Sequence, residues 1–270
     1  MTMTFKKSVA ALASVAALTF AGSANAYLTK WYLDANGATG GSGDAIQVTN
    51  YLDLTGQAFI QITSNPLPNL MAPAYTFNEA GLFNTFSADQ STPLGANSLH
   101  STFTASGSGD INTAKVIFNA GGLLNVYAAS NALIGTFSMT SGDGQVRTGT
   151  VLPNGTFSLI FQAQSLAAGY FYDSAMNDLS ANVGAGLTFG FATTNAIDLD
   201  DNDVSATNKA ALANAYNSAF GTSLTVSDNN IDKLLVSNNG QFRLAIPEPT
   251  SMALVGLGLT GLAALRRRKA

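Results

Sequence analysis

Four aspartates crowd into residues 198–203, which read DLDDND. Carboxylate oxygens at alternate positions of a tight loop are ligands that Ca²⁺ prefers. An EF-hand loop starting here would need glycine at its sixth position and glutamate at its twelfth, where the chain has aspartate and lysine. The segment is therefore either a calcium site of another class or a solvated loop whose acids favour the positive N-terminus of a following helix. No metal site is assigned, and the calcium candidates are Asp198, Asp200, Asp201 and Asp203.

Few other residues could carry a reaction. The chain has no cysteine and one histidine, His100, which disfavours thiol chemistry, His-based zinc sites and Ser-His-Asp triads. His100 stands in the alternating stretch NSLHSTFTAS and is expected at a half-exposed strand position. A glycosidase needs two carboxylates across a cleft, yet no spacing pairs Glu79, the only glutamate before Glu248, with an aspartate. The sequence predicts a protein that is not an enzyme, with a polysaccharide hydrolase as an alternative.

Carbohydrate binding is a second alternative, because aromatic rings can stack on sugar rings. The side chains available for this are Trp31, Tyr32, Tyr170, Phe171 and Tyr172. In a β-rich domain, however, most aromatic side chains fill the core. A carbohydrate-binding module for an extracellular polysaccharide therefore stays the runner-up function.

Charge is distributed unevenly along the chain. Residues 27–250 hold six basic and sixteen acidic side chains, a formal charge of −10, while the other six basic residues lie in the terminal segments. Binding of nucleic acid depends on lysine and arginine neutralising phosphates. The sequence therefore predicts no nucleic-acid partner.

The first 26 residues have the three zones of a secretory signal peptide. Lys6 and Lys7 precede an apolar run, and Ala24 and Ala26 provide the small residues that signal peptidase accepts next to the cut. We expect cleavage after Ala26, so that the mature chain begins at Tyr27 and folds outside the cytoplasm.

The other end of the chain combines three elements in order. The tripeptide Pro247, Glu248, Pro249 precedes sixteen residues without a charge. As a helix this apolar run would span about 24 Å, against a hydrocarbon core of about 30 Å. A basic stop-transfer cluster follows, which by the positive-inside tendency stays in the cytoplasm; it consists of Arg266, Arg267, Arg268 and Lys269.

Together these elements, in residues 246–270, resemble the sorting segment called PEP-CTERM. In that family, found in Gram-negative bacteria that make exopolysaccharide, the tripeptide marks processing by an exosortase, a membrane-embedded cysteine transpeptidase, and the tail is discarded. The resemblance implies export across the inner membrane and transient anchoring by a C-terminal transmembrane sorting helix. It also implies a final place at the cell surface or in the extracellular matrix.

A second resemblance concerns the body of the chain. The stretches WYLDANG, GYFYDSAMNDLSANVGAGLTFGFATTNA and SNNGQFRLAIPEP are similar to the flocculation-associated group of PEP-CTERM proteins. This resemblance implies a structural or adhesive matrix protein. Such a protein would promote the aggregation of cells, or the formation of a biofilm, within exopolysaccharide.

Residues 27–245 are expected to form one all-β domain. Period-2 alternation, as in QAFIQIT and TFSLIFQAQ, indicates strands with one buried face. Groups rich in glycine and asparagine, namely SGSGD, NAGG, SGDG, PNG and NNG, are predicted turns. The pattern favours an antiparallel β-sandwich with one or two short helices. The predicted strands are 30–34, 45–50, 57–63, 98–105, 115–119, 123–128, 133–140, 145–152, 156–163, 187–193, 234–237 and 241–246.

Residues 205–220 are predicted to form a helix. Ser205 is a capping residue, alanines fill the interior and Gly221 ends the pattern. Leu212, Tyr216 and Phe220 recur near one face, so the helix is expected to cover an edge or end of the sheet. A second short helix at 228–235 competes with the strand predicted at 234–237.

Overall fold

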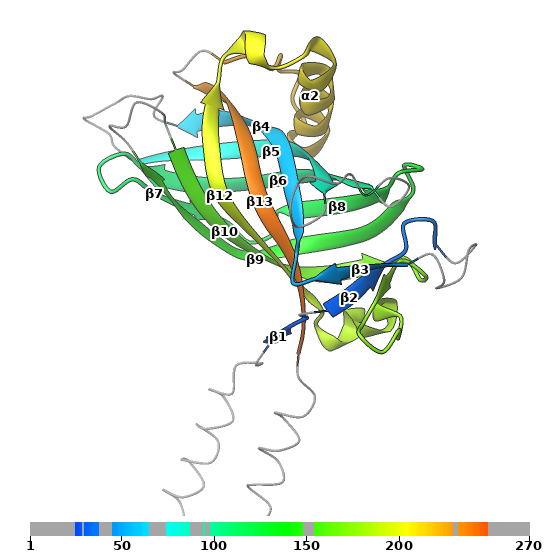
Figure 1. The fold of residues 1–270 in the computed structure, drawn as a ribbon. Helices are drawn as coiled ribbons and strands as arrows, with labels where there is room; N and C mark the ends of the chain where they lie inside the picture. The colour runs from blue at the N-terminus through cyan, green and yellow to red at the C-terminus, as the bar shows by residue number, and fades with distance from the viewer. Residues whose placement is uncertain are drawn as a thin grey trace, which may run out of the picture. The chain divides into compact units, whose positions relative to one another are not determined.

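The strands of this protein form one large sheet and one small one (Figure 1). The computed structural model describes residues 25–28, 30–37, 45–64, 74–86, 94, 98–147, 154–228 and 232–247. Tyr27–Ala245 forms one unit of the chain. The predicted signal peptide as far as Ala24, the predicted membrane helix and the basic cluster lie outside the described residues. Within the described ranges, no helix is long and apolar enough to span a bilayer.

The large sheet contains β4 (Leu52–Ser64), β5 (Ala74–Phe86), β6 (Leu99–Asp110), β7 (Lys115–Phe118), β8 (Leu123–Ala128), β9 (Leu133–Arg147), β10 (Asn154–Leu166), β12 (Thr188–Leu199), β13 (Lys233–Pro247) and the short β1 (Asn25–Tyr27). The small sheet contains β2 (Lys30–Leu33), β3 (Ile46–Thr49) and β11 (Phe171–Tyr172). The helices are the 3-10 turns η4 (Leu179–Ala185) and η5 (Asp201–Asp203) and the α-helix α2 (Ala206–Phe220).

The large sheet closes on itself. Neighbouring strands pair antiparallel in the order β4, β5, β6, β7 with β8, β9, β10, β12, β13, and β13 then pairs with β4. This last pairing runs from Lys233 opposite Gln61 to Phe242 opposite Leu52. We call these strands the closed sheet. The prediction of an all-β antiparallel domain is confirmed, whereas the sandwich is wrong, because one sheet surrounds the core where a sandwich would have two stacked sheets.

Strands β7 and β8 share one position in the closed sheet. β7 pairs with Gly107–Asp110 of β6, and β8 runs in the same direction beside the preceding part of β6. Both also pair with β9. The NAGG segment between them is thus an interruption of one strand position, and the chain does not reverse there as in a hairpin. The closed sheet consequently has eight strand positions.

Several predicted turns lie inside long strands. SGSGD belongs to β6, SGDG to β9 and NNG to β13. Glycine is required there by close packing: a Cβ on Gly107 would lie 2.5 Å from the ring of Phe77, its cross-strand partner, and one on Gly240 would lie 2.7 Å from the ring of Phe191. Phenylalanine rings thus cover strand glycines, and strands predicted as two short pieces are single strands of fifteen residues in β9 and β13.

Aromatic rings fill one end of the closed sheet. Trp31 of the small sheet packs against Phe171 and against Phe242 of β13, with ring centroids 6.2 and 5.8 Å apart. Phe242 in turn contacts Phe189, and Phe189 contacts Phe161 at 5.6 Å. These rings are fully buried, so the end of the closed sheet next to the small sheet is filled by side chains.

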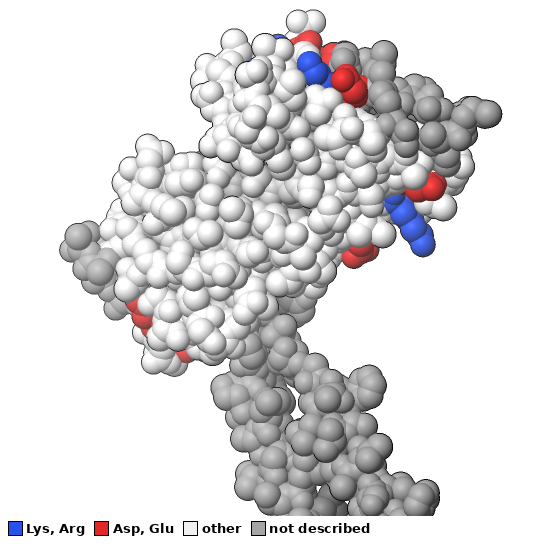
Figure 2. All heavy atoms as spheres, turned by 180° about the vertical axis from the view of Figure 1, so that it is seen from behind, with Lys and Arg blue, Asp and Glu red and all other residues white. Residues whose placement is uncertain are grey.

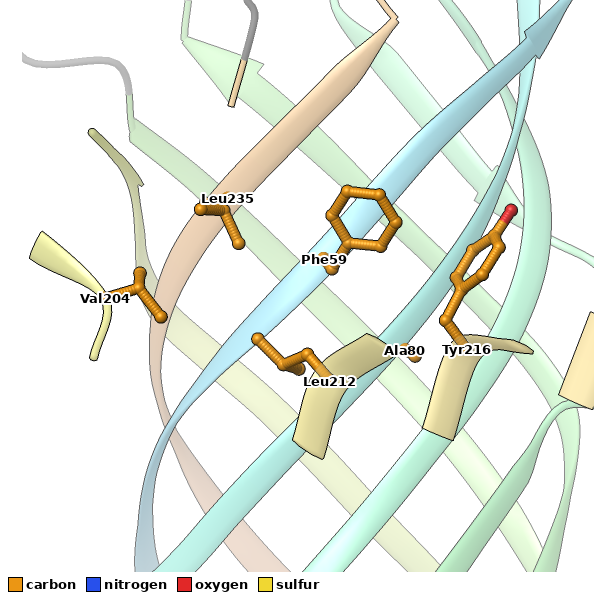
Figure 3. Close-up of a cluster of buried hydrophobic side chains, with 6 residues drawn as sticks. All are labelled: Phe59, Ala80, Val204, Leu212, Tyr216 and Leu235. Carbon is orange, nitrogen blue, oxygen red and sulfur yellow. The ribbon is translucent and has the colours of Figure 1, made fainter. Parts of the chain in front are cut away.

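Helix α2 covers the outer surface of the closed sheet (Figure 3). The predicted helix is confirmed, including its ends: Ser205 Oγ accepts a hydrogen bond from Asn208 N at 3.1 Å, and Gly221 adopts a left-handed φ of 64°. The expectation that it covers an edge or end is wrong, because its apolar side chains pack on a face. The buried cluster consists of Phe59, Ala80, Val204, Leu212, Tyr216 and Leu235.

The competing helix at 228–235 is wrong from Lys233 onward, since β13 begins there. Its first residues, 229–231, lie outside the described part of the chain.

Leu212 is fully buried between α2 and the closed sheet, so Leu212→Ala should destabilise the protein. We expect a loss of about 3 kcal/mol, the middle of the range for buried leucine truncation, measured by urea unfolding. Ser218→Ala, an exposed position on the same helix, is the matched control and should change the free energy of unfolding by less than about 0.5 kcal/mol. Equal effects of the two changes would show that α2 is not packed on the sheet.

Candidate functional site: the interior cavity

The closed sheet encloses a cavity of about 240 Å³. Its lining includes Ile62 near the end of β4, Tyr75 at the start of β5 and Leu234 at the start of β13. The cavity therefore lies toward the end of the sheet opposite the small sheet. The lining is almost wholly apolar: among the described residues, the polar side chains in it are Tyr75, Glu79, Asp198 and Asn238.

Glu79 places a carboxyl group in this apolar space. It lies at an inward position of β5, opposite Ile60 of β4 and Ala105 of β6, and is 6% exposed. Burial raises the pKa of Glu79 from 4.5 to about 8. At neutral pH the group is therefore mainly an uncharged carboxylic acid, which can donate a hydrogen bond.

Asp198 and Asn238 bring two further polar groups to the cavity from β12 and β13. The Oδ1 atom of each is buried without a hydrogen-bond partner. The two strands pair with Asp198 opposite Val236, two residues from Asn238, so the side chains are diagonal neighbours. Burial first, and then the negative charges of Asp228 and Asp200, raise the pKa of Asp198.

Phenylalanine rings form a large part of the cavity wall. Phe77 and Phe118 meet edge to face at 5.3 Å, and Phe118 meets Phe157 at 5.8 Å. Two further ring pairs line the cavity: the ring centroids of Phe83 and Phe191 are 5.6 Å apart, and those of Phe103 and Phe161 are 6.1 Å apart. Such walls suit an apolar molecule better than a sugar, because a sugar carries many hydroxyls that would lose their hydrogen bonds to water.

The aspartates of residues 198–203 make different contacts and do not converge on one point. Asp198 faces the cavity, whereas Asp201 accepts a hydrogen bond from Asp228 N at 2.9 Å and lies 3.8 Å from Lys209 Nζ. Asp203 Oδ2 accepts from Asp200 N at 3.2 Å. In the part of the chain that the structure describes, no group of three or more His, Asp or Glu side chains could hold a metal ion.

The sequence-predicted aromatic candidates separate into buried and partly exposed groups. Trp31 is 0% exposed and Phe171 is 1% exposed, so neither can stack on a sugar. Tyr32, Tyr170 and Tyr172 are partly exposed. Tyr32 and Tyr172 lie directly opposite each other in the small sheet, so their side chains share one face of it.

His100 occupies the predicted half-exposed strand position. It lies in β6 and stacks on Tyr127 of β8, with ring centroids 5.1 Å apart and planes 11° from parallel. Burial lowers the pKa of His100. His100 is not part of the cavity lining.

The sorting residues fall mainly beyond the described ranges. Pro247 is the last residue of β13, and Ala26 lies in β1. Glu248, Pro249 and the basic cluster are outside the described residues.

Comparison with known protein families identifies the C-terminal segment. Residues 245–269 match the family model for the PEP-CTERM protein-sorting motif. No curated protein and no solved structure matches the chain. The segment is therefore a PEP-CTERM sorting motif, which marks an exported surface protein processed by an exosortase and transiently anchored in the membrane of a Gram-negative bacterium.

Sequence reasoning missed β5 and, with it, the inward position of Glu79. The segment reads AYTFNEAGLFNTF, in which Tyr75, Phe77 and Phe83 alternate as in a strand. Glu79 and Gly81 interrupt the apolar series at its centre. Continuing the alternation through the glutamate would have pointed to a buried carboxyl.

The protonation of Glu79 predicts how stability depends on pH. Its pKa is higher in the folded chain than in the unfolded one, so its contribution to stability is full below about pH 4.5 and is lost as pH rises to about 8. With the pKa raised from 4.5 to about 8, we expect the loss to reach about 5 kcal/mol. Glu79→Gln should remove this part of the slope and be more stable than the unmodified protein at pH 9, as measured by urea unfolding across pH 5–9.

Asp198 and His100 also titrate abnormally, so the informative quantity is the difference between the two proteins at each pH. Parallel pH profiles for Glu79→Gln and the unmodified protein would contradict a neutral Glu79.

Proposed function

We propose that this chain is an exported structural or adhesive protein of the extracellular matrix, which promotes cell aggregation within exopolysaccharide after exosortase processing. The observation that carries the proposal is the PEP-CTERM sorting motif at 245–269. The roles in flocculation and biofilm formation rest only on the resemblance of three stretches of the sequence to the flocculation-associated group, since no curated protein matches the chain.

The surface chemistry supports a place among polysaccharide chains. The face drawn in Figure 2 carries charged side chains mainly at its margins, with a broad uncharged area between them. Outward positions of β6, β8, β9 and β10 bear hydroxyl and amide groups, which form hydrogen bonds with sugar hydroxyls. These partly or fully exposed residues include Thr102, Thr104, Asn125, Ser138, Thr140, Ser158, Gln162 and Gln164.

We propose a role without catalysis. The carboxyls of Glu79 and Asp198 share the interior cavity and are one pair that a hydrolase could use. Polysaccharide cleavage needs a carboxyl pair flanking a sugar chain in a cleft, and the apolar cavity wall is a poor match for sugar. Turnover of the host's own polysaccharide by the purified protein would establish the hydrolase alternative instead.

The matrix role predicts the outcome of gene deletion in the host. Deletion should reduce floc formation while the amount of polysaccharide made stays unchanged. The unmodified gene should restore flocs, and the double variant Pro247→Ala/Pro249→Ala should not, because its product is made but mislocalised. Intact-mass analysis of the restored strain should find a product that begins at Tyr27 and ends near Pro249.

The matched control is Pro153→Ala, a proline change outside the motif, which should restore flocs like the unmodified gene. Full restoration by the double variant, or a released product that still contains Arg266, would contradict the role of the motif.

A carbohydrate-binding site is the second candidate, favoured by the tyrosine pair of the small sheet. Tyr32 and Tyr172 are cross-strand partners with partly exposed rings. Lys30 Nζ lies over the Tyr32 ring, 5.4 Å from its centre, and can donate hydrogen bonds to a sugar at this site. Two aromatic rings flanked by a donor form a short platform on which sugar rings can stack. Trp31, the tryptophan among the predicted sugar-binding residues, is fully buried, so the tyrosine pair is the better candidate for stacking on sugar.

Tyr32→Ala with Tyr172→Ala should therefore weaken binding to the host exopolysaccharide by at least tenfold in a pull-down titration. Leu133→Ala, which truncates a side chain 51% exposed on the closed sheet, should leave binding unchanged. Unaltered binding by the double variant would remove the small sheet as a carbohydrate site while leaving the matrix role intact.

A further inference from the structure

We propose that the interior cavity of the closed sheet binds a small uncharged organic molecule with one or two rings and a hydroxyl group. The proposal is independent of the matrix role. It depends on the size of the cavity, on its aromatic walls and on buried polar atoms that have no partner within the protein.

The cavity volume limits the size of the ligand. At about 240 Å³ it exceeds an engineered cavity of about 150 Å³ that binds benzene, and it is smaller than typical pockets for drug-sized molecules, of about 300–1,000 Å³. One or two fused rings fit these limits, and a polysaccharide chain does not.

The walls select for an unsaturated ring. Phe77, Phe118 and Phe157 present a series of edge-to-face contacts along one side of the cavity. A planar ring can join that series at similar centroid distances, with a stabilisation beyond the burial of its area. Flexible alkyl chains would gain the area term alone.

The buried polar atoms select for a hydroxyl group. Asn238 is 5% exposed and its Oδ1 has no hydrogen-bond partner, and the Oδ1 of Asp198 is likewise unpartnered. Buried polar atoms are nearly always satisfied in folded proteins, so these two acceptors indicate a missing donor. A ligand hydroxyl provides that donor in the cavity which both residues line.

The same side chains disfavour charged ligands. Within the described residues the cavity lining contains no lysine, arginine or histidine, so an anion would have no counter-charge. An anion would also lie near the carboxyl groups of Glu79 and Asp198, and its negative charge would repel any negative charge on them. A cation would lose its hydration in the same apolar cavity, where Glu79 is uncharged at neutral pH, so the ligand is uncharged.

Three probes test this specificity: 2-naphthol, naphthalene, which lacks the hydroxyl, and 2-naphthoate, which is an anion at pH 7. They are titrated against the protein as its host exports it, with binding followed by calorimetry and by the rise in Tm. We expect 2-naphthol to bind about fivefold more tightly than naphthalene, the effect of one hydrogen bond of about 1 kcal/mol. We expect 2-naphthoate to bind at least tenfold more weakly than 2-naphthol.

A matched pair of variants on β7 locates the binding site. Val116 is 5% exposed and lines the cavity, while its neighbour Ile117 is 57% exposed on the outside. Val116→Phe fills the cavity and should weaken 2-naphthol binding at least tenfold, whereas Ile117→Phe should leave it unchanged. The double variant Asp198→Leu/Asn238→Leu removes both unpartnered acceptors and should abolish the preference for 2-naphthol over naphthalene. It decides the matter if Val116→Phe fails to fold.

The proposal is overturned if the unmodified protein binds neither 2-naphthol nor naphthalene. It is also overturned if the double variant Asp198→Leu/Asn238→Leu keeps the preference, or if folded Val116→Phe and Ile117→Phe bind 2-naphthol equally. Binding of 2-naphthoate as tight as that of 2-naphthol would overturn the uncharged class of ligand.

Discussion

The pairing of β13 with β4 is the constraint on which the rest of the structure depends. It joins residues about 180 positions apart in the chain and runs in continuous register from Lys233 and Gln61 to Phe242 and Leu52. Closure satisfies the backbone groups that two exposed sheet edges would leave unpaired. It also gives every strand one face toward the interior and one toward the exterior. The cavity is lined by the interior faces, and helix α2 packs on the exterior ones.

Strand alternation then assigns each residue to one of two environments. On β5, Phe77, Glu79 and Phe83 point inward, while Ala80 points outward beneath α2. Because the inside is apolar, a carboxyl there loses its charge at neutral pH, and the molecule retains a buried acid at a cost in stability that grows with pH. Helix α2 covers only part of the outside of the closed sheet (Figure 1). The remaining strands carry hydroxyl and amide groups on their outer side.

Local features of the chain were predictable, and long-range ones were not. The signals at Ser205 and Gly221 gave the helix to within a residue, because capping depends on nearby backbone groups. The glycines of SGSGD, SGDG and NNG misled the turn prediction, because what fixes them is a ring on the same or a neighbouring strand, as Phe77 does for Gly107. The alternation around Glu79 could have predicted an inward position, but the enclosed apolar surroundings of that position follow from closure of the sheet, and no local pattern reveals that β4 meets β13.

The terminal signals illustrate the opposite case. The tripeptide at Pro247, Glu248 and Pro249 could be recognised from sequence because a processing enzyme reads it as a short linear segment, and residues 245–269 match the sorting motif. The cavity has no such linear signature. Its lining comes from strands spread between Leu54 and Asn238, so it exists only once the sheet has closed.

The most direct test of this account is nuclear Overhauser contact measurement across the closing pair of strands. Antiparallel pairing predicts backbone contacts between Leu54 and Gly240, and between Ala58 and Val236, in the register of the structure. Their observation together with the β12–β13 contacts would support a closed sheet around an interior cavity. If β12–β13 and β4–β5 contacts appear while those between β4 and β13 are absent, the sheet is open, and the account of the cavity and of Glu79 is contradicted.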